Sequence, residues 1–170
     1  SPERLVVRGE VYMTKSDFAE LNARLSEAGE KTYLNPRNTA AGSLRQLDPR
    51  MTAKRPLKIL VYQIIESSDP TPTTQWETLN YLQNLGFPVS NINSHVTDIE
   101  SAIRFCEMQA NQRSQWPFEA DGIVIKINDL KLAERLGYVG KDPRGAIAYK
   151  YPAQEVSTKL LDIIVNVGRT

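Results

Sequence analysis

The sequence predicts an α+β fold with largely antiparallel sheets and flanking helices, on two observations. Strand-like segments, in which apolar and β-branched residues alternate with polar ones, are mixed irregularly with amphipathic helical segments. The regular strand–helix–strand rhythm that builds a parallel sheet is missing. A length of 170 residues suits one domain with a sizeable core.

The first two predicted elements are a strand and a helix. Residues 5–13 alternate apolar and polar side chains, which indicates a strand. Thr14 or Ser16 can then cap a helix, and Gly29 ends it. One face of this helix carries the apolar residues Phe18, Leu21, Leu25 and Ala28.

The next segment, residues 34–55, has little periodicity. Asn35-Pro36 and Asp48-Pro49 act as breakers in it, and small residues at 40–43 open a short helix. Residues 57–65 are strongly apolar and of strand length, so we expect a strand buried on both faces.

The second half of the chain alternates less predictably between the two kinds of element. Periodicity and flanking glycine or proline predict helices over residues 75–85, 98–112 and 130–136. Alternation or apolar runs predict strands over residues 118–128 and 145–151, and one or two strands over residues 156–167. Residues 67–74, which contain two prolines, form a loop between elements.

The net charge of +1 hides an uneven distribution of charged residues. Residues 36–58 hold six basic side chains against one acid, whereas residues 59–120 hold two against seven. Such asymmetry favours one local face for a polyanion rather than a wholly basic nucleic-acid binder. A solvated basic loop is the alternative explanation.

Several classes of site and location are not supported by the sequence. It has no phosphate-binding glycine loop of the P-loop or Rossmann type, and no Cys/His cluster at zinc spacing. His95 is the only histidine and lies in a turn-like segment, and Cys106 fits a small core residue of a reducing compartment. No apolar run reaches the length of a membrane span, and no secretory signal is present, so we expect a cytoplasmic protein.

Two lysines stand at the ends of apolar strands. Lys126 follows the alternation of residues 121–125, and Lys150 repeats that pattern after residues 146–149. A lysine in such a place either extends to solvent or supplies positive charge to a site. The pair, with Asp121-Gly122 at the start of one strand, favours a shared anion pocket.

Glu10 is the acidic counterpart of these lysines. It lies on an apolar strand beside Gly9, which permits close approach of another backbone. Its carboxylate could accept hydrogen bonds from ribose hydroxyls. A salt bridge to Arg8 or Arg4 is the structural alternative.

Arg37 and Arg45 flank a run of small residues that cannot shield them. The guanidinium group of arginine can donate two hydrogen bonds to phosphate oxygens, and small neighbouring residues let a nucleic-acid backbone come close. Solvated arginines on an ordinary capped helix are the alternative interpretation.

Four strings resemble successive nucleotidyltransferase motifs of bacterial NAD-dependent DNA ligases. They are residues 8–13, 35–45, 121–126 and 148–153, and they occur in the family's order. The Asp-Gly-x-Val-x-Lys string recurs across related ligases and capping enzymes, whereas the asparagine-proline-arginine run is more specific to the NAD-dependent branch. The resemblance implies the nucleotidyltransferase (ATP-grasp-like ligase) fold, truncated at both ends.

The resemblance also implies an activity. In that family a lysine attacks the α-phosphate of NAD, the adenylate passes to the 5′-phosphate of a nick, and the 3′-hydroxyl displaces AMP during replication and repair. Glu10 would hold the ribose, Lys126 and Lys150 would lie against the adenine and α-phosphate, and Arg37, Arg45 and Arg113 would meet phosphates. The partner would be nicked double-stranded DNA, Mg²⁺ would be required, and the enzyme would act as a monomer.

One departure from the family's pattern is important. The nucleophile of the family lies in a Lys-x-Asp-Gly motif, which this sequence lacks. We expect it upstream of Ser1, and we expect the family's zinc site outside this chain. Residues 1–163 would then be a partial adenylation domain and residues 164–170 the start of an OB-fold domain.

Two other functions fit the sequence. An ATP-dependent ligase or capping-type nucleotidyltransferase shares the same core motifs. A non-catalytic nucleic-acid-binding module would explain the basic segment and the missing lysine, and its DNA affinity would depend on salt but not on nucleotide.

Overall fold

The computed structural model describes residues 2–152 and 157–165. Its elements, in chain order, are β1 (Leu5–Tyr12), α1 (Lys15–Glu27), α2 (Pro36–Leu44), α3 (Pro49–Ala53), β2 (Lys58–Ser67), α4 (Gln75–Asn84), α5 (Ile99–Gln112), η1 (Arg113–Gln115), β3 (Gly122–Lys126), α6 (Leu130–Leu136), β4 (Tyr138–Val139), β5 (Asp142–Pro143) and β6 (Ala146–Lys150).

The strands of the described residues form three two-stranded antiparallel sheets. β1 pairs with β2, β3 with β6, and the short β4 with β5. In the first sheet Glu10 lies opposite Leu60, and the register shifts between Arg8 and Gly9. In the second sheet Gly122 lies opposite Lys150. The predicted α+β class with antiparallel sheets is confirmed.

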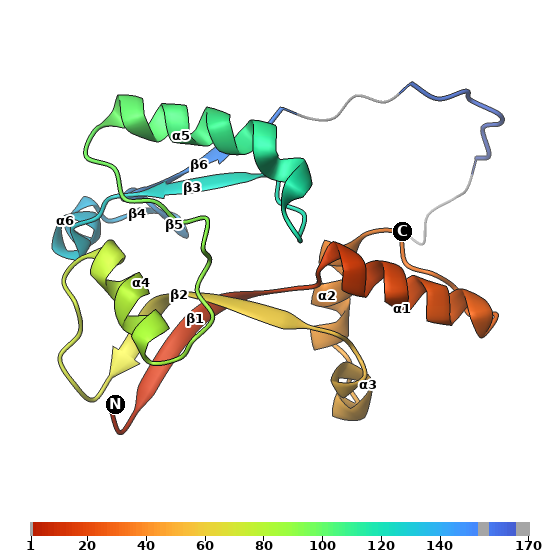
Figure 1. Ribbon diagram of the computed structural model, residues 1–170, viewed down its shortest axis with the longest axis horizontal. Coiled ribbons are helices and arrows are strands. Elements are labelled where there is room, and N and C mark those ends of the chain that lie inside the picture. The colour runs from red at the N-terminus through yellow and green to blue at the C-terminus, as the bar shows by residue number, and fades with distance from the viewer. Residues whose placement is uncertain (1, 153–156, 166–170) are drawn as a thin grey trace.

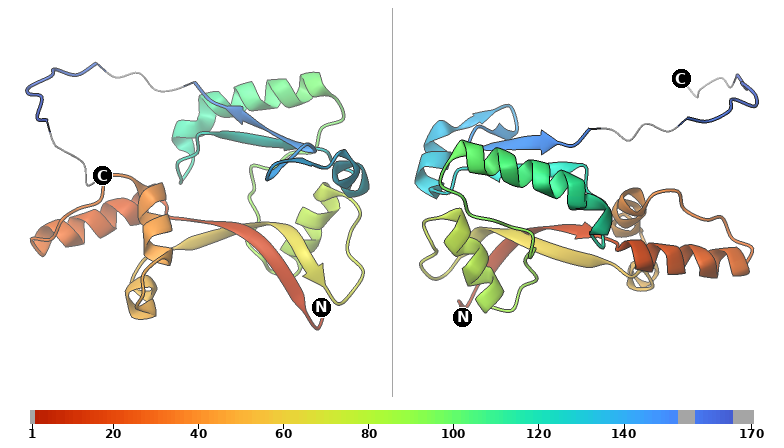
Figure 2. Two further views of the ribbon diagram at one scale, coloured as in Figure 1. Left: turned by 180° about the vertical axis from the view of Figure 1, so that it is seen from behind. Right: turned by 45° about the horizontal axis from the view of Figure 1, so that its top comes forward.

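The two larger sheets lie in separate layers (Figure 1). α5 lies over β3 and β6 on the side away from β1 and β2, whereas α4 packs against β2. α1, α2 and α3 gather at the end of the β1–β2 ribbon opposite to α4, as the rear view also shows (Figure 2). This arrangement places the end of β1 and the start of α2 below the segment that leads into β3.

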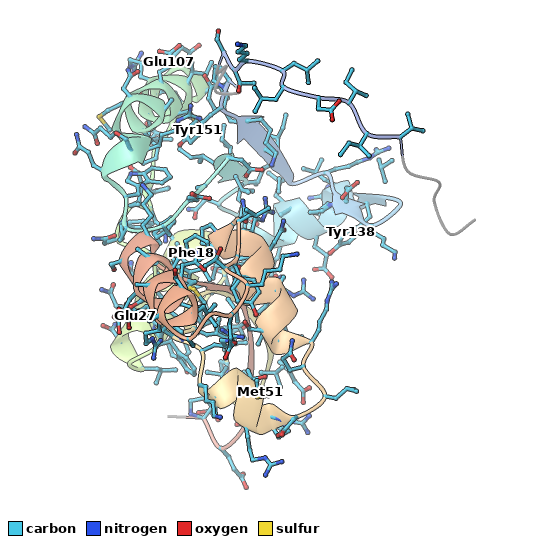
Figure 3. All side chains as sticks on the ribbon, turned by 90° about the vertical axis from the view of Figure 1, so that its right-hand side faces the viewer. Phe18, Glu27, Met51, Glu107, Tyr138 and Tyr151 are labelled. Atoms are coloured by element: carbon cyan, nitrogen blue, oxygen red, sulfur yellow. The ribbon has the colours of Figure 1, made fainter. Side chains whose placement is uncertain are left out.

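The core is small and divided. Met13, Leu21 and Ala40 are buried together where β1, α1 and α2 meet, with Phe18 and Leu25 packed against them. A second set lies under α5 and includes Cys106, Trp116 and Tyr151, all of them buried. Figure 3 shows Tyr151 between α5 and the end of β6. The first set holds β1, α1 and α2 together, and the second packs beneath α5.

Helix caps explain where several helices begin. The side chains of Thr14, Asn35, Thr74 and Asp98 each accept a hydrogen bond from a backbone N–H of the first turn. The short helix expected to open at residues 40–43 begins earlier, at Pro36, and a helix that the sequence did not predict begins at Pro49. Each proline occupies the first helical position, where its missing N–H costs nothing, so α2 and α3 begin there.

Two strand predictions also need correction. β2 is not buried on both faces: Val61 is buried, but Ile59 and Ile65 are exposed, because within the described residues α4 is the only helix that packs closely against β2. The strand expected over residues 156–167 is absent from residues 157–165, where no neighbouring strand offers a ladder of hydrogen bonds. Residues 156, 166 and 167 lie outside the described part.

Candidate functional site

A cleft of about 760 Å³ lies between the layers. It is bounded by the end of β1, the start of α2, the η1 loop, the segment that leads into β3 and the residues that follow β6. Its charged lining residues are Glu10, Lys15, Arg37, Arg113, Glu119 and Asp121. Three cations and three carboxylates give the cleft lining no net charge.

Lys15 joins the two walls of this cleft. Its backbone N–H donates to the carbonyl of Pro117 at 2.8 Å, and its Nζ donates to the carbonyl of Ser114 at 2.9 Å. The start of α1 is thereby fixed to the η1 loop, although the two segments are about a hundred residues apart in sequence.

Glu10 projects from β1 as a free carboxylate. The salt-bridge alternative does not occur, because Arg4 pairs with Glu66 and Arg8 donates to the Gln63 amide oxygen. Glu10 has no ion-pair partner within the residues that the structure describes. Its carboxylate oxygens are therefore available to a ligand in the cleft.

Gly9 allows a close approach, as expected, and the approaching backbone is that of β2. A Cβ at this position would lie 2.6 Å from the carbonyl oxygen of Leu60 and 2.9 Å from a side-chain carbon of Ile59. The glycine thus permits the register shift next to Glu10.

Arg37 and Lys150 converge on one carboxylate oxygen. Oδ2 of Asp121 accepts from Lys150 Nζ at 2.9 Å and from Arg37 Nη1 at 3.3 Å. Arg37 comes from the first turn of α2 and Lys150 from the end of β6. The hydrogen bond from Lys150, with the charges of Lys150 and Arg37, holds the pKa of Asp121 below its ordinary value.

Arg113 lies at the junction of α5 and η1, on the wall opposite Glu10. Its Nη1 donates to the carbonyl of Pro152 at 3.3 Å, and its guanidinium carbon lies 5.5 Å from the ring centroid of Tyr151. These contacts orient the guanidinium toward the cleft that it lines.

Lys126 and Lys150 are on the same face of one sheet but at opposite ends. Lys150 pairs with Gly122 and Ala146 with Lys126, so the two lysines are separated by four residues along the ladder. At the rise of a strand this corresponds to about 13 Å. Neither lysine is among the residues that line the cleft, and Lys126 instead lies over the ring of Tyr62.

Arg45 lies beyond the last turn of α2, eight positions after Arg37. Eight helical residues span about 12 Å, so the two guanidinium groups begin from opposite ends of the helix. Arg45 is exposed and does not line the cleft. It belongs to a surface adjoining the site rather than to its interior.

Three residues near the site were not singled out in the sequence as site residues. Asp121 supports an anion pocket in the sequence only through its place at the start of a strand, and Lys15 and Tyr62 carry no sequence signal of a site. The Asp-Gly step before an apolar strand is the only local signal, since the roles of Lys15 and Tyr62 depend on which segments pack together.

The remaining chemical candidates lie elsewhere. His95 stacks on Trp76 at a centroid distance of 5.9 Å, and its Nε2 lies 3.2 Å from the amide nitrogen of Asn128. Burial raises the pKa of the Cys106 thiol.

Across residues 2–152 and 157–165, no three His, Cys, Asp or Glu side chains are grouped so that they could hold a metal ion. No helix of that same part is long and apolar enough to cross a membrane.

Comparison with known proteins identifies the family to which the chain belongs. The sequence model of the NAD-dependent DNA ligase adenylation domain matches residues 1–154. The chain is 52% identical over 169 residues to a DNA ligase of Chloroflexus aurantiacus, 49% over 169 residues to one of Roseiflexus sp., and 46% over 171 residues to one of Dehalococcoides mccartyi.

These alignments cover 99%, 99% and 100% of the chain, but 24%, 23% and 25% of the respective relatives. The chain therefore spans about a quarter of the length of the curated relatives it matches. The family model and the identities agree, and the chain belongs to the family of NAD-dependent DNA ligase adenylation domains.

Proposed function

We propose that this chain supplies ribose- and phosphate-binding groups to an NAD-dependent DNA ligase that seals nicks in duplex DNA. The reaction would run through an enzyme-adenylate and a DNA-adenylate, in replication and repair. We place it in the bacterial cytoplasm, on the nucleoid, and expect the enzyme to act as a monomer.

The cleft is the observation that carries this proposal. It collects Glu10, Arg37 and Arg113 from three segments that are far apart in sequence, and two of these residues come from strings that resemble the ligase motifs. A free carboxylate and two guanidinium groups in one cleft match the two parts of a nucleotide, a ribose with hydroxyl donors and a phosphate with anionic oxygens.

The role of each residue follows from this division. Glu10 accepts hydrogen bonds from the ribose, while Arg37, Arg113 and Lys150 stabilise negative charge on phosphate oxygens as the phosphorus is attacked. Lys126, beside the ring of Tyr62, takes the base side of the nucleotide. Arg45, outside the cleft, contacts the DNA backbone.

The attacking lysine is not assigned within residues 1–170. No Lys-x-Asp-Gly string occurs in the sequence, and we propose that the nucleophile belongs to another part of the polypeptide. Residues 1–170 alone are therefore expected neither to accept AMP covalently nor to seal a nick.

Magnesium fits this site only in part. Mg²⁺ is commonly held by one or two carboxylates together with substrate phosphates, and it does not need a cage made of protein alone. The carboxylates of Glu10, Glu119 and Asp121 line the cleft, but Asp121 is engaged by two cations. Glu10 and Glu119 are the residues that would contribute, and the metal would neutralise charge on the phosphate.

The intact mass of the full-length gene product, after incubation with magnesium and either NAD or ATP, tests the proposal. We expect covalent AMP from NAD and not from ATP. Adduct from ATP alone would move the protein to the ATP-dependent branch, and no adduct with either would favour a DNA-binding module.

A pair of variants tests the role of the cleft in the same assay. Glu10→Gln should slow adenylation by roughly 10- to 100-fold, the value of a hydrogen bond to a charged group. Glu20→Gln removes one exposed carboxylate from α1, outside the cleft, and should have a much smaller effect. Equal losses in the two variants would contradict the ribose role of Glu10.

A further inference from the structure

The side chain of Asp121 contacts two cations, Lys150 and Arg37, at the edge of the cleft. Its Oδ2 accepts from Lys150 Nζ at 2.9 Å and from Arg37 Nη1 at 3.3 Å, so one oxygen bridges two positive charges. Arg37 belongs to α2, whereas Lys150 belongs to β6, and Asp121 lies next to both at the edge of the cleft. No other described carboxylate contacts more than one cation.

The backbone of Asp121 is held by a hydrogen bond within the fold, whereas its side chain is exposed to solvent. The carbonyl of Asp121 accepts the backbone N–H of Tyr151 at 2.9 Å, which holds the residue to the end of β6. The side chains of Asp121, Lys150 and Arg37 are 62%, 62% and 67% exposed. Water and solutes can therefore reach every member of the bridge without any change in the fold.

We propose that Asp121 is a built-in anion that competes with phosphate for Arg37 and Lys150. In the unliganded cleft its carboxylate holds the two cations together, which positions them for a phosphate. An entering phosphate takes over both hydrogen bonds, and Asp121 turns to solvent. The inference rests on the proposed function only where it identifies that phosphate as part of an adenylate.

The magnitudes allow this exchange. Exposed ion pairs are individually weak because water and salt screen them, so a phosphate with two charges and several oxygens can displace a single carboxylate. Removing the competing charge should strengthen phosphate binding by roughly threefold to tenfold, the range expected from one or two such pairs. A residue that served only the fold would give no gain in affinity.

Nucleotide titrations on the full-length protein, freed of covalent adenylate and kept in EDTA, test the proposal. Asp121→Asn should lower the Kd of AMP by roughly threefold to tenfold and leave the Kd of adenosine unchanged. The difference between the two ligands isolates the phosphate. Glu119→Gln, which also removes one carboxylate from the cleft, should change the Kd of AMP by less than about twofold because Glu119 bridges no described cations.

A double variant shows whether the gain in AMP affinity depends on the cations that Asp121 contacts. Lys150→Met combined with Asp121→Asn should abolish the gain in AMP affinity. An unchanged or higher Kd of AMP in Asp121→Asn, with adenosine binding intact, overturns the proposal.

Inorganic pyrophosphate separates this inference from the proposed function. If neither AMP nor adenosine binds the wild-type protein, the nucleotide role fails, and pyrophosphate then decides the role of Asp121. Tighter pyrophosphate binding by Asp121→Asn supports the built-in anion, and equal binding by the two proteins overturns it.

Discussion

The ammonium of Lys126 lies over the ring of Tyr62, with Nζ 4.7 Å from the ring centroid. The contact joins β3 to β2 and so connects the two larger sheets. Burial, and after it the charge of Arg8, lowers the pKa of Lys126 from its ordinary value. A second cation nearby would lower the pKa of Lys126 further, whereas an anionic ligand would favour its ammonium form.

The first prediction concerns the charge of Arg8. Arg8→Gln removes a cation near Lys126, so the pKa of Lys126 should rise. Arg4→Gln is the matched control, because Arg4 directly precedes the same strand but pairs with Glu66. NMR titration of reductively methylated lysines in the full-length protein measures the pKa, and an equal response to both changes would contradict the assignment.

The second prediction concerns Gly122. A Cβ there would fall against the carbonyl oxygen of Tyr149 and lie 3.1 Å from Lys150 Cα, so Gly122→Ala should force β3 and β6 apart. We expect a loss of about 1–3 kcal/mol in local stability, typical of overpacking. Hydrogen–deuterium exchange of residues 122–126 and 146–150 measures it.

Gly42 provides the control for this change. It lies within α2, and nothing stands within 4 Å of the position of its Cβ. Gly42→Ala should therefore stabilise α2 by roughly 0.5–1 kcal/mol. Faster exchange in both variants would mean that the crowding at Gly122 is not the cause.

The elements that could be predicted are those with local signals. α1 and α5 each have a capping side chain at the N-terminal end and a run of apolar residues at helical spacing, so residues near one another decide them. α2 begins at Pro36 rather than at residues 40–43, and α3 was not predicted, because a proline that looks like a breaker also fits the first position of a helix. The burial of β2 and the state of residues 157–165 depend on neighbours that no local window contains.

The site divides in the same way. Glu10 and Arg37 could be singled out by residue type and motif, and Arg113 through the family resemblance alone, and the structure brings all three to one cleft. The bridge at Asp121 could not be predicted, because it requires the pairing of Gly122 with Lys150 and the docking of α2 against the start of β3. Both are tertiary relationships between segments separated by more than 25 residues in the chain.

The third prediction concerns the hydroxyl of Tyr151. Tyr151 is 7% exposed, and its hydroxyl is buried without a hydrogen-bond partner among the described residues. Tyr151→Phe should leave stability unchanged or raise it by up to about 1 kcal/mol, because it removes an unsatisfied polar group. Tyr151→Leu should lower stability by roughly 1–3 kcal/mol, since packing on Trp116 and the contact with Arg113 are lost. Thermal unfolding compares the two, and a Phe variant less stable than wild type would reveal a missing partner.

The fourth prediction is a dependence of stability on pH at Asp17. The hydrogen bond from Thr14, with the Lys58 ammonium 3.2 Å away, holds the pKa of Asp17 below its ordinary value. A carboxyl group with a depressed folded-state pKa contributes stability above its unfolded pKa of about 4, and that contribution is lost as pH falls through the folded value. Asp17→Asn should cost roughly 0.5–1.5 kcal/mol at pH 7 and progressively less below pH 4. Urea unfolding at pH 7 and pH 3 measures this, and a cost independent of pH would contradict it.

The fifth prediction separates two arginines of the basic segment. Arg45 has no ion-pair partner in residues 2–152 and 157–165, whereas Arg50 donates to both carboxylate oxygens of Asp48 at 2.9–3.1 Å. A guanidinium already paired with a carboxylate releases few counterions when it meets a phosphate. Arg45→Ala should therefore weaken binding to nicked duplex DNA and reduce the slope of log K against log salt by about one, while Arg50→Ala should change it little.

Fluorescence anisotropy of the full-length protein on a nicked duplex, over a series of salt concentrations, gives both slopes. Adenylation from NAD should be the same in the two variants, because neither arginine lines the cleft. The contact is electrostatic, so the loss in Arg45→Ala should be alike for nicks of different sequence. A loss that varied with the bases flanking the nick would mean that Arg45 reads the bases. Equal slopes for Arg45→Ala and wild type would move the DNA-contacting surface away from the end of α2.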